Sequence, residues 1–450
     1  MKPAILCGCF TITVLFALSQ NGSHSQEENV TLQNISNDTV LINLANTYFK
    51  QIRSISDKDH GKFWGLPIYG PIMIVDPDKR IIYANEQDNL NSLVRIKDIY
   101  IGILPDTEAV ANTSISWRGK RWTMLIWGSL SKNDLKRNRL VFHELFHSIQ
   151  DELGLPLKGG FSDHLDQKEG RIYFRLELEA LKSALANHGH KRKKDLQNAF
   201  NFRMFRYQLF PNAKEMESAL EWSEGLAEFS GVSLSKINEG TKNLYLGNLI
   251  DSATIFYPSF MRSFAYITGP VYGQLLSEKN PGWQRRITSQ DDFSKLILKK
   301  YRLKQVHDLS GAVALEFNNY NGTVIKQEEE KKEQVRIEQV DKIRKKYTDA
   351  PVLIIPFSNK ATGSFGPNNI IKISGSETFY ESLELIDSFG RLTINKGGLK
   401  DYSKKQVRVS LPDLAVPNQP IIKTDEWELQ LNKGWKLVPG PNKNLIVMQQ

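Results

Sequence analysis

The pentapeptide His143-Glu144-Leu145-Phe146-His147 restricts the possible folds of this chain more than any other feature of its sequence. In a helix of 3.6 residues per turn, histidines four positions apart lie about 40° from each other on one face. Their imidazoles can bind one metal ion, and the glutamate after the first histidine then lies beside that ion. The chain is therefore expected to bury a helix here, with its histidine face turned toward a metal.

The residues around the motif favour such a helix. Residues 134–150 contain neither Pro nor Gly, and apolar side chains recur at helical intervals, namely Leu140, Val141, Leu145, Phe146 and Ile149. Ser131 or Asp134 can cap its start, and Gly154 follows its end. Because unpaired imidazoles are costly to bury, metal ligation is the expected role of His143 and His147.

A catalytic zinc usually has three protein ligands and one position left for water, so a third ligand is needed. The best candidates lie in the acidic, helix-like stretch 221–229. Glu224 and Glu228 are four positions apart there, so one can bind the metal while the other supports a ligand histidine. Glu144 is the expected general base, which takes a proton from the attacking water.

Two segments resemble the gluzincin metallopeptidases. Residues 222–227 read W-S-E-G-L-A and are similar to the W-x-N-E-G-F-A segment of the aminopeptidase branch. That resemblance implies that Glu224 is the third zinc ligand and that Glu228 supports a ligand histidine. Residues 266–269 read Y-I-T-G and resemble the Y-x-K-G segment, whose tyrosine hydrogen-bonds the transition-state oxyanion. By this match Tyr266 is catalytic, with Tyr272 as the alternative.

The chain also departs from that family. His147 and Glu224 are separated by 76 residues, which is more than in the aminopeptidases and requires additional helices. Thr268 stands where the family has lysine, and the G-x-M-E-N segment that recognises a free substrate amine is missing from the sequence, so exopeptidase activity is not implied. Gln150 and Leu153 exclude the metzincin extension, which requires glycine and histidine at these positions.

Residues 1–19 have the pattern of a signal peptide. Lys2 precedes an apolar run, and residues 17–19 form a small-x-small cleavage site. Both cysteines, Cys7 and Cys9, fall in this segment, so the mature chain is expected to fold without disulfides. No later stretch is apolar and long enough to span a bilayer. We therefore expect a secreted or periplasmic bacterial protein with no stable membrane insertion after signal cleavage.

The sequence predicts an α+β fold of several parts. A zincin-like metallopeptidase domain is expected over residues 20–322, a charged helical linker over 323–349 and a β-sandwich-like domain over 350–450. In the first domain, segments 71–75 and 80–84, and 113–117 and 121–127, have the pattern of two hairpins. Helices are expected over 39–55, 169–186 and 196–209, with the basic run 188–194 as a solvated turn.

The zincin-like fold implies a mixed sheet with an antiparallel edge strand beside the active-site helix. Residues 112–117 are the candidate strand, with which an extended substrate would pair. Arginines 171, 175, 203 and 206 recur on the helices between the metal motifs. We expect them mainly in structural ion pairs, for example with Glu177 or Glu179, and alternatively in binding of substrate carboxylates.

The net charge of +9 is spread along the chain, and the basic run 188–194 has no interleaved aromatic residues, so no nucleic-acid partner is expected. A phosphate-binding glycine loop and a serine nucleophile elbow are also missing from the sequence.

The sequence thus favours a zinc metallopeptidase that acts on a peptide or protein substrate, although the same site would hydrolyse a non-peptide amide. The expected ligands are His143, His147 and Glu224, with Glu144 as general base and Tyr266 as oxyanion donor. The alternative is a non-catalytic secreted or envelope binding protein with a structural zinc site. Glu144 argues against it, because a structural site requires no general base.

Overall fold

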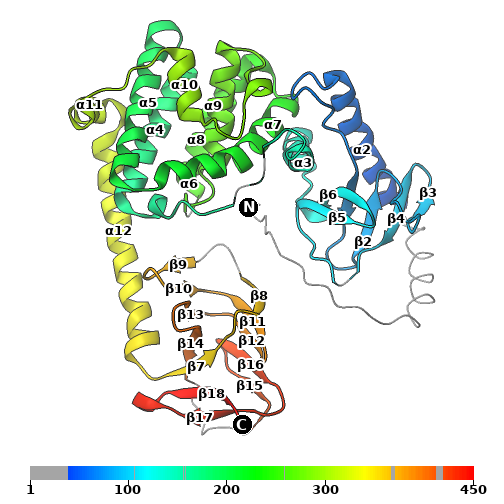
Figure 1. The fold of residues 1–450 in the computed structure, drawn as a ribbon, viewed down its shortest axis with the longest axis vertical. Helices are drawn as coiled ribbons and strands as arrows, with labels where there is room; N and C mark the ends of the chain where they lie inside the picture. The colour runs from blue at the N-terminus through cyan, green and yellow to red at the C-terminus, as the bar shows by residue number, and fades with distance from the viewer. Residues whose placement is uncertain are drawn as a thin grey trace. The chain divides into compact units, whose positions relative to one another are not determined.

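The computed structural model describes residues 39–450, except residues 106, 156, 158, 258, 366–369 and 412–418. The predicted signal peptide, residues 1–19, lies outside the described residues. The chain divides into two compact units, of which the first ends at Lys326 and the second begins at Gln327. Its architecture is mixed α+β, with helices and both mixed and antiparallel sheets (Figure 1).

The first unit contains a six-stranded sheet with the strand order β3-β4-β2-β1-β6-β5. Its strands are β1 (Ile72–Val75), β2 (Ile81–Ala84), β3 (Val94–Ile96), β4 (Ile99–Ile103), β5 (Thr113–Trp117) and β6 (Lys120–Ile126). Neighbouring strands are antiparallel except β1 and β6, which are parallel. Both predicted hairpins are confirmed, because β1 pairs with β2 and β5 pairs with β6.

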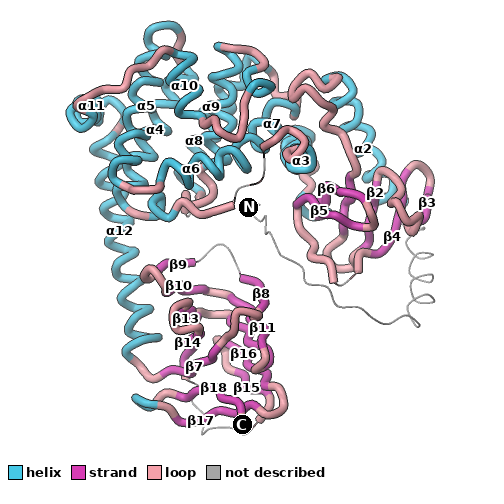
Figure 2. Tube along the Cα trace, in the orientation of Figure 1, coloured by secondary structure: helices cyan, strands magenta, loops and turns pink. Residues whose placement is uncertain are grey.

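Both faces of this sheet are apolar because side chains alternate between two separate cores. Ile72, Ile74 and Leu125 pack into the main core of the unit, whereas Met73 and Trp122 belong to a smaller cluster on the other side. In Figure 2 the sheet and α2 lie on one side of the unit and most other helices on the other, with α3 and α7 between them. The motif-bearing helix α3 is therefore held between the sheet and the helices.

The helices of the first unit are α2 (Thr39–Asp59), α3 (Asp134–Ile149), α4 (Lys168–Ala186), α5 (Gly189–Leu209), α6 (Ala213–Leu220), α7 (Leu226–Leu234), α8 (Glu239–Phe256), α9 (Ala265–Lys279), α10 (Phe293–Tyr301) and α11 (Leu309–Glu316). The helices predicted over residues 39–55, 169–186 and 196–209 are confirmed by α2, α4 and α5. None of the described helices combines the length and apolar composition that a membrane crossing needs.

Two local predictions were wrong. The basic run 188–194 is not a turn, because α5 already begins at Gly189. Arg192 points inward and donates to the backbone carbonyls of Ala184 and Asn187, which ties α5 to the end of α4. The cap of α3 is neither Ser131 nor Asp134 but Asn133, whose side chain accepts from the Lys136 amide at 3.1 Å.

The second unit contains two sheets and most of the long helix α12 (Gly322–Arg344), since the unit begins at Gln327. The seven-stranded sheet has the order β17-β18-β7-β14-β13-β10-β9, and the five-stranded sheet has the order β15-β16-β12-β11-β8. Their strands are β7 (Val352–Pro356), β8 (Thr362–Phe365), β9 (Ile370–Lys372), β10 (Glu377–Tyr380), β11 (Leu383–Asp387), β12 (Gly390–Ile394), β13 (Gly398–Asp401), β14 (Gln406–Ser410), β15 (Ile421–Lys423), β16 (Trp427–Leu431), β17 (Trp435–Pro439) and β18 (Leu445–Gln449).

All neighbouring strands of this unit are antiparallel except β7 and β18. Leu353 and Val407 of one sheet and Leu392 and Trp427 of the other belong to one core, so the two sheets pack face to face. The end of α12 is not an isolated linker: Val340 and Ile343 belong to a small core with strand residues of this unit.

Candidate metal centre

His143 and His147 on α3 meet Glu224, which lies on the π-helical turn Glu221–Gly225 between α6 and α7. The two Nε2 atoms are 3.3 Å apart, and Glu224 Oε2 lies 3.4 Å from Nε2 of His143 and 3.7 Å from that of His147. All three side chains are buried. Among the described residues, they form the one group of histidine, cysteine or acidic side chains that can hold a metal ion.

The other nitrogen of each histidine is occupied by a neighbour. Nδ1 of His143 lies 3.0 Å from Glu228 Oε2, and Nδ1 of His147 lies 3.0 Å from Gln150 Oε1. Because a carboxylate and an amide oxygen only accept, each Nδ1 carries the proton and donates it. The neutral form of each ring then has its Nε2 lone pair directed into the cluster, which is the tautomer that metal binding requires.

Glu228 connects this centre to a basic side chain. Arg139, one helical turn before His143, donates to Glu228 Oε1, and its Nη1 also donates to the Tyr245 hydroxyl at 2.9 Å. Burial raises the pKa of Glu228, but Arg139 and the hydrogen bond from His143 outweigh burial, and the net pKa is lowered. Glu228 is therefore ionised and holds the His143 ring in place.

The charges of the cluster are strongly coupled. Burial lowers the pKa of His143, but hydrogen bonds to Glu224 and Glu228 raise it to about 10. Burial raises the pKa of Glu224, but the two histidines hold it well below its usual range. The acidic side chains of the centre thus favour a positive charge at this position, and without a metal ion a proton on His143 supplies that charge. A divalent ion would take the place of that proton.

Glu144 differs from the other acidic residues of the centre. It is buried, and its Oε2 has no hydrogen-bond partner among the described residues. Burial raises the pKa of this carboxyl, although His143 and His147 act in the opposite direction. A buried carboxylate oxygen without a partner is costly, and its position next to both histidines makes it available to a water or substrate.

Of the two tyrosines predicted as alternatives, the structure brings Tyr266 to the cluster. Its hydroxyl donates to Glu224 Oε2 at 2.5 Å, and its ring stacks on His143 with centroids 5.4 Å apart. Tyr272 is buried elsewhere, and its hydroxyl donates to Glu177 at 2.8 Å. The two positions diverge because both residues lie on α9, six steps apart, and so on different faces of one helix.

Glycines allow the helices to approach closely around the centre. A Cβ on Gly269 of α9 would lie 2.3 Å from the Cα of Gly225 on the π-helical turn. A Cβ on Gly231 of α7 would lie 2.5 Å from the carbonyl oxygen of Arg139 on α3. The glycines of the E-G-x-A and Y-x-x-G segments thus have a physical role, because they bring Glu224 and Tyr266 together.

A second group of buried charges, here called the ion-pair network, lies next to the centre and comprises Glu177, Arg203, Arg206, Glu217 and Glu221. Arg203 binds both oxygens of Glu221 at 2.7 and 2.9 Å and also binds Glu177. Arg206 binds Glu177 and both oxygens of Glu217.

The predicted pairing of Arg203 and Arg206 with Glu177 is confirmed. Thr268 of α9 also donates to Glu221 at 2.6 Å. Glu221, three residues before Glu224, is therefore fully engaged in the network and is not turned toward the histidines.

The predicted edge strand lies beside the motif helix. β5 is the last strand of its sheet, and Ser114 on it lies 3.4 Å, Oγ to Oγ, from Ser148 on α3. Arg121 of β6 donates to the carbonyl of His147 at 3.0 Å and to Ser114 Oγ at 2.9 Å. The hairpin β5–β6 is thus tied to the end of α3 that carries the second histidine.

Sequence reasoning did not identify three residues of the centre, which are Arg139, Gln150 and Arg262. Arg139 and Gln150 lie four positions before His143 and three after His147, and this helical spacing was a signal for both. Arg262, whose Nη2 lies 3.6 Å from Glu224 Oε1, had no such signal, because it precedes α9 and approaches through the fold.

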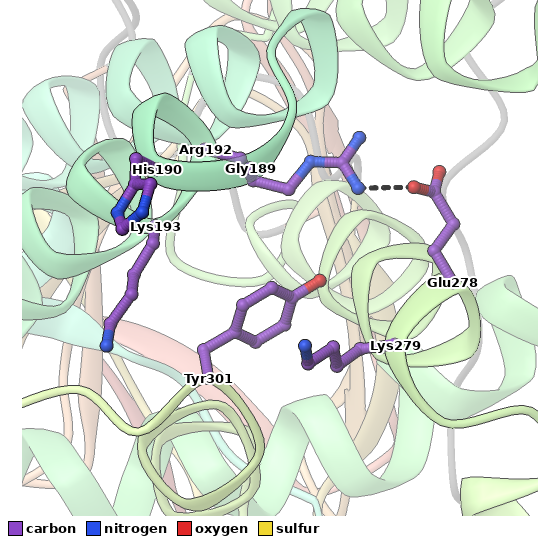
Figure 3. A pocket seen from close by; sticks show the side chains of 7 residues that line it. All are labelled: Gly189, His190, Arg192, Lys193, Glu278, Lys279 and Tyr301. Atoms are coloured by element: carbon purple, nitrogen blue, oxygen red, sulfur yellow. Dashed lines mark hydrogen bonds and ion pairs between the residues drawn. The ribbon is translucent and has the colours of Figure 1, made fainter.

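The structure also contains a pocket of about 340 Å³ where α5 begins and α9 and α10 end. Figure 3 shows its lining, in which Arg192 pairs with Glu278 while Lys279 and Tyr301 lie nearby. None of the lining residues belongs to the metal centre. The charge of Arg192 is already paired with Glu278, and the residues that could hold a metal ion are His143, His147 and Glu224, outside this pocket.

The chain matches no protein-family model, and comparisons with curated proteins and with solved structures found no match. The functional argument therefore rests on the geometry of the site.

Proposed function

We propose that this chain is a zinc-dependent hydrolase that cleaves peptide bonds, a metallopeptidase of gluzincin type whose first unit has a zincin-like fold. The observation that carries the proposal is the convergence of His143, His147 and Glu224 beside Glu144, whose Oε2 has no hydrogen-bond partner among the described residues. The resemblance of residues 222–227 and 266–269 to gluzincin segments agrees with this combination.

The spacing of the ligand atoms favours zinc. Zinc–nitrogen and zinc–oxygen bonds of about 2.0–2.2 Å in a tetrahedral site separate neighbouring ligand atoms by about 3.3–3.6 Å. The three separations in the centre are 3.3, 3.4 and 3.7 Å. Two imidazoles and one carboxylate are also a ligand set that catalytic zinc sites use, with a fourth position open to water.

When bound, the zinc would polarise the substrate carbonyl and acidify a water molecule. Glu144 takes a proton from the attacking water, whose oxygen bonds to the carbonyl carbon. The carbon–nitrogen bond then breaks, and the amine leaves with the proton that Glu144 returns. Water is thus divided between the two products, an acid and an amine, and no further reactant is needed.

Tyr266 is the proposed donor to the oxyanion that develops during this attack. Its hydroxyl is already directed at Glu224 Oε2 within the cluster. The outer edge of β5 is the proposed docking strand, because an extended peptide can pair with a sheet edge that lies beside the motif helix. The proposed location, secreted or periplasmic, rests on the signal-peptide pattern of residues 1–19.

The second candidate is a binding protein with a structural zinc site. Structural sites usually have four protein ligands, which leaves no position for water. The cluster in the described residues has three. A buried glutamate whose Oε2 has no partner among the described residues would also serve no purpose in a structural site, so the hydrolase is the better proposal.

The test combines metal content with turnover. The purified full-length protein is expected to contain about one zinc per chain and to cleave an unstructured protein substrate. A chelator should abolish cleavage, and added zinc should restore it. Stoichiometric zinc without cleavage of any substrate in a broad panel, and without a change in any property on Glu144→Gln, would instead establish the structural site.

A further inference from the structure

Arg262 is a positively charged side chain at the metal centre for which the proposed chemistry has no use. Its Nη2 lies 3.6 Å from Glu224 Oε1, the oxygen of that carboxylate farther from the histidines. Tyr266 approaches the other oxygen, Oε2. Arg262 lies just before α9, and Tyr266 lies four positions later in its first turn. The Arg262 guanidinium and the Tyr266 hydroxyl therefore both approach the carboxylate of Glu224.

The guanidinium is held on both sides. The ring of Phe161 lies against it, 5.4 Å from centroid to Cζ, and Glu224 lies at its tip. A backbone hydrogen bond of 3.0 Å from Ser162 to the Met261 carbonyl joins the two loops that carry Phe161 and Arg262. Ser263 Oγ donates to the Ser259 carbonyl at 2.6 Å and steadies the second loop. Arg262 is therefore positioned by the fold and not a freely moving surface side chain.

This arginine nevertheless has unused donors. Its side chain is 29 % exposed, and it donates no hydrogen bond to any of the described residues. Phe161 beside it is 49 % exposed, so its ring also faces solvent. A guanidinium offers five N–H donors in a planar fork that matches a carboxylate. Such a group, partly buried and open to solvent, suits an anion that arrives from solution.

We propose that Arg262 determines substrate specificity by binding a carboxylate of the substrate close to the scissile bond, with Phe161 packing beside it. This inference rests on the proposed function and adds the substrate class, peptides that carry a carboxylate next to the cleaved amide. The carboxylate comes either from a free C-terminus or from an acidic side chain, and both present the same planar anion.

The test measures binding as well as turnover. Peptides are titrated by calorimetry into zinc-loaded Glu144→Gln protein, which should bind substrate without rapid cleavage. One pair of peptides differs in a free or amidated C-terminus, and a second pair of capped peptides differs in Asp or Asn beside the scissile bond. We expect about 10–100-fold tighter binding of the acid member of at least one pair, the usual contribution of a charged hydrogen bond.

Arg262→Gln in the same protein should abolish this discrimination while zinc content stays unchanged. Arg262→Lys should retain part of it, because lysine keeps the charge but not the fork. The matched control is Arg286→Gln, an exposed arginine that donates to Asn280 in another part of the unit. It should leave the discrimination intact.

The outcomes separate this inference from the proposed function. Discrimination in the first pair identifies a C-terminal carboxylate as the anion, and discrimination in the second identifies an acidic side chain. Discrimination that survives Arg262→Gln, or cleavage by the Glu144-containing enzyme with no preference in either pair, would overturn this inference alone. Failure to bind or cleave any peptide with zinc in place would overturn both.

Discussion

One π-helical turn contributes to two groups of buried charges, Glu221 to the ion-pair network and Glu224 to the metal centre, and the two groups are paired in different ways. In the ion-pair network, each carboxylate oxygen of Glu177, Glu217 and Glu221 accepts from an arginine. In the metal centre, two imidazole nitrogens face each other at 3.3 Å, and Glu144 Oε2 has no partner in the part of the chain that the structure describes. Both groups are costly to bury, and the carboxylates of the network are the more completely paired.

This difference in hydrogen bonding helps to distinguish buried carboxylates that stabilise the fold from buried carboxylates that serve a ligand site. Burial raises the pKa of Glu217, but Arg206, His164 and Arg203 together outweigh burial and lower the net pKa, so this carboxylate stays ionised in the folded protein. The metal centre is paired less completely, because Glu144 Oε2 has no partner among the described residues, and it is open to added groups beside Tyr266 and Arg262, both partly exposed. Carboxylates paired on both oxygens therefore indicate a structural role, and an unpaired carboxylate oxygen near partly exposed residues indicates a ligand site.

The largest expected effect contrasts Glu224 with Glu221, three residues apart. Glu224→Ala should remove zinc from the purified protein and abolish turnover, because it deletes one of three ligands. Glu221→Ala should retain zinc but lower the free energy of unfolding by about 3–5 kcal/mol, because Arg203 loses its bidentate partner. Metal analysis and denaturant unfolding measure the two effects. Zinc loss in Glu221→Ala with retention in Glu224→Ala would reverse the assignment.

The second effect concerns Glu144, the unpaired carboxylate. Glu144→Gln keeps the shape of the side chain but cannot accept a proton, so turnover should fall by about 10²–10⁴-fold. Zinc content should not change. Glu152→Gln, at an exposed position beyond the end of α3, is the control and should keep normal kinetics. Near-normal hydrolysis by zinc-loaded Glu144→Gln would mean that another group acts as the base.

The third effect separates the two tyrosines of α9. Tyr266→Phe should lower kcat by about 10–10³-fold with zinc and fold intact, because it removes the proposed oxyanion donor. Tyr272→Phe should leave kcat nearly unchanged and instead reduce stability by about 1.5–3 kcal/mol, because its buried hydroxyl donates to Glu177, which also pairs with two arginines. Steady-state kinetics and thermal unfolding of both variants test this contrast. A loss of kcat only in Tyr272→Phe would mean that Tyr272, and not Tyr266, is the oxyanion donor.

The smallest effect concerns Glu228, which supports His143 from outside the ligand set. Glu228→Gln should weaken zinc binding by about 10–100-fold without abolishing it, because it removes the charge that fixes the His143 ring and its tautomer. Competition with a zinc chelator of known affinity measures the change. Glu215→Gln, at an exposed position on α6, should have no effect. Unchanged affinity in Glu228→Gln would show that Arg139 and Glu228 serve only packing.

Short-range patterns were predictable because they depend on the helix and strand periods. The spacing of His143 and His147 placed both on one face of a helix, and turn residues indicated the hairpins β1–β2 and β5–β6. The run 188–194 is exposed to solvent as predicted except at Arg192, but it was wrong to predict a turn, because α5 begins at Gly189. In the structure, Arg192 finds acceptors in α4 and Glu278, and tertiary contacts thus override composition.

The sequence by itself determined the chemistry that the centre can contain, namely two histidines, a neighbouring base and acidic residues at helical spacing downstream. It also determined that β5 and β6 pair locally. Spacing alone left Glu224 and Glu228 as candidates, and the resemblance favoured Glu224, but only the tertiary structure brings Glu224 to the histidines and Glu221 to Arg203. The same holds for Tyr266 and Tyr272, and for Arg262. The spacing of the metal ligands depends on how separate segments of the chain pack together. Close contacts such as that between Gly225 and Gly269 determine this packing, and they join residues too far apart in the sequence for a local pattern to predict.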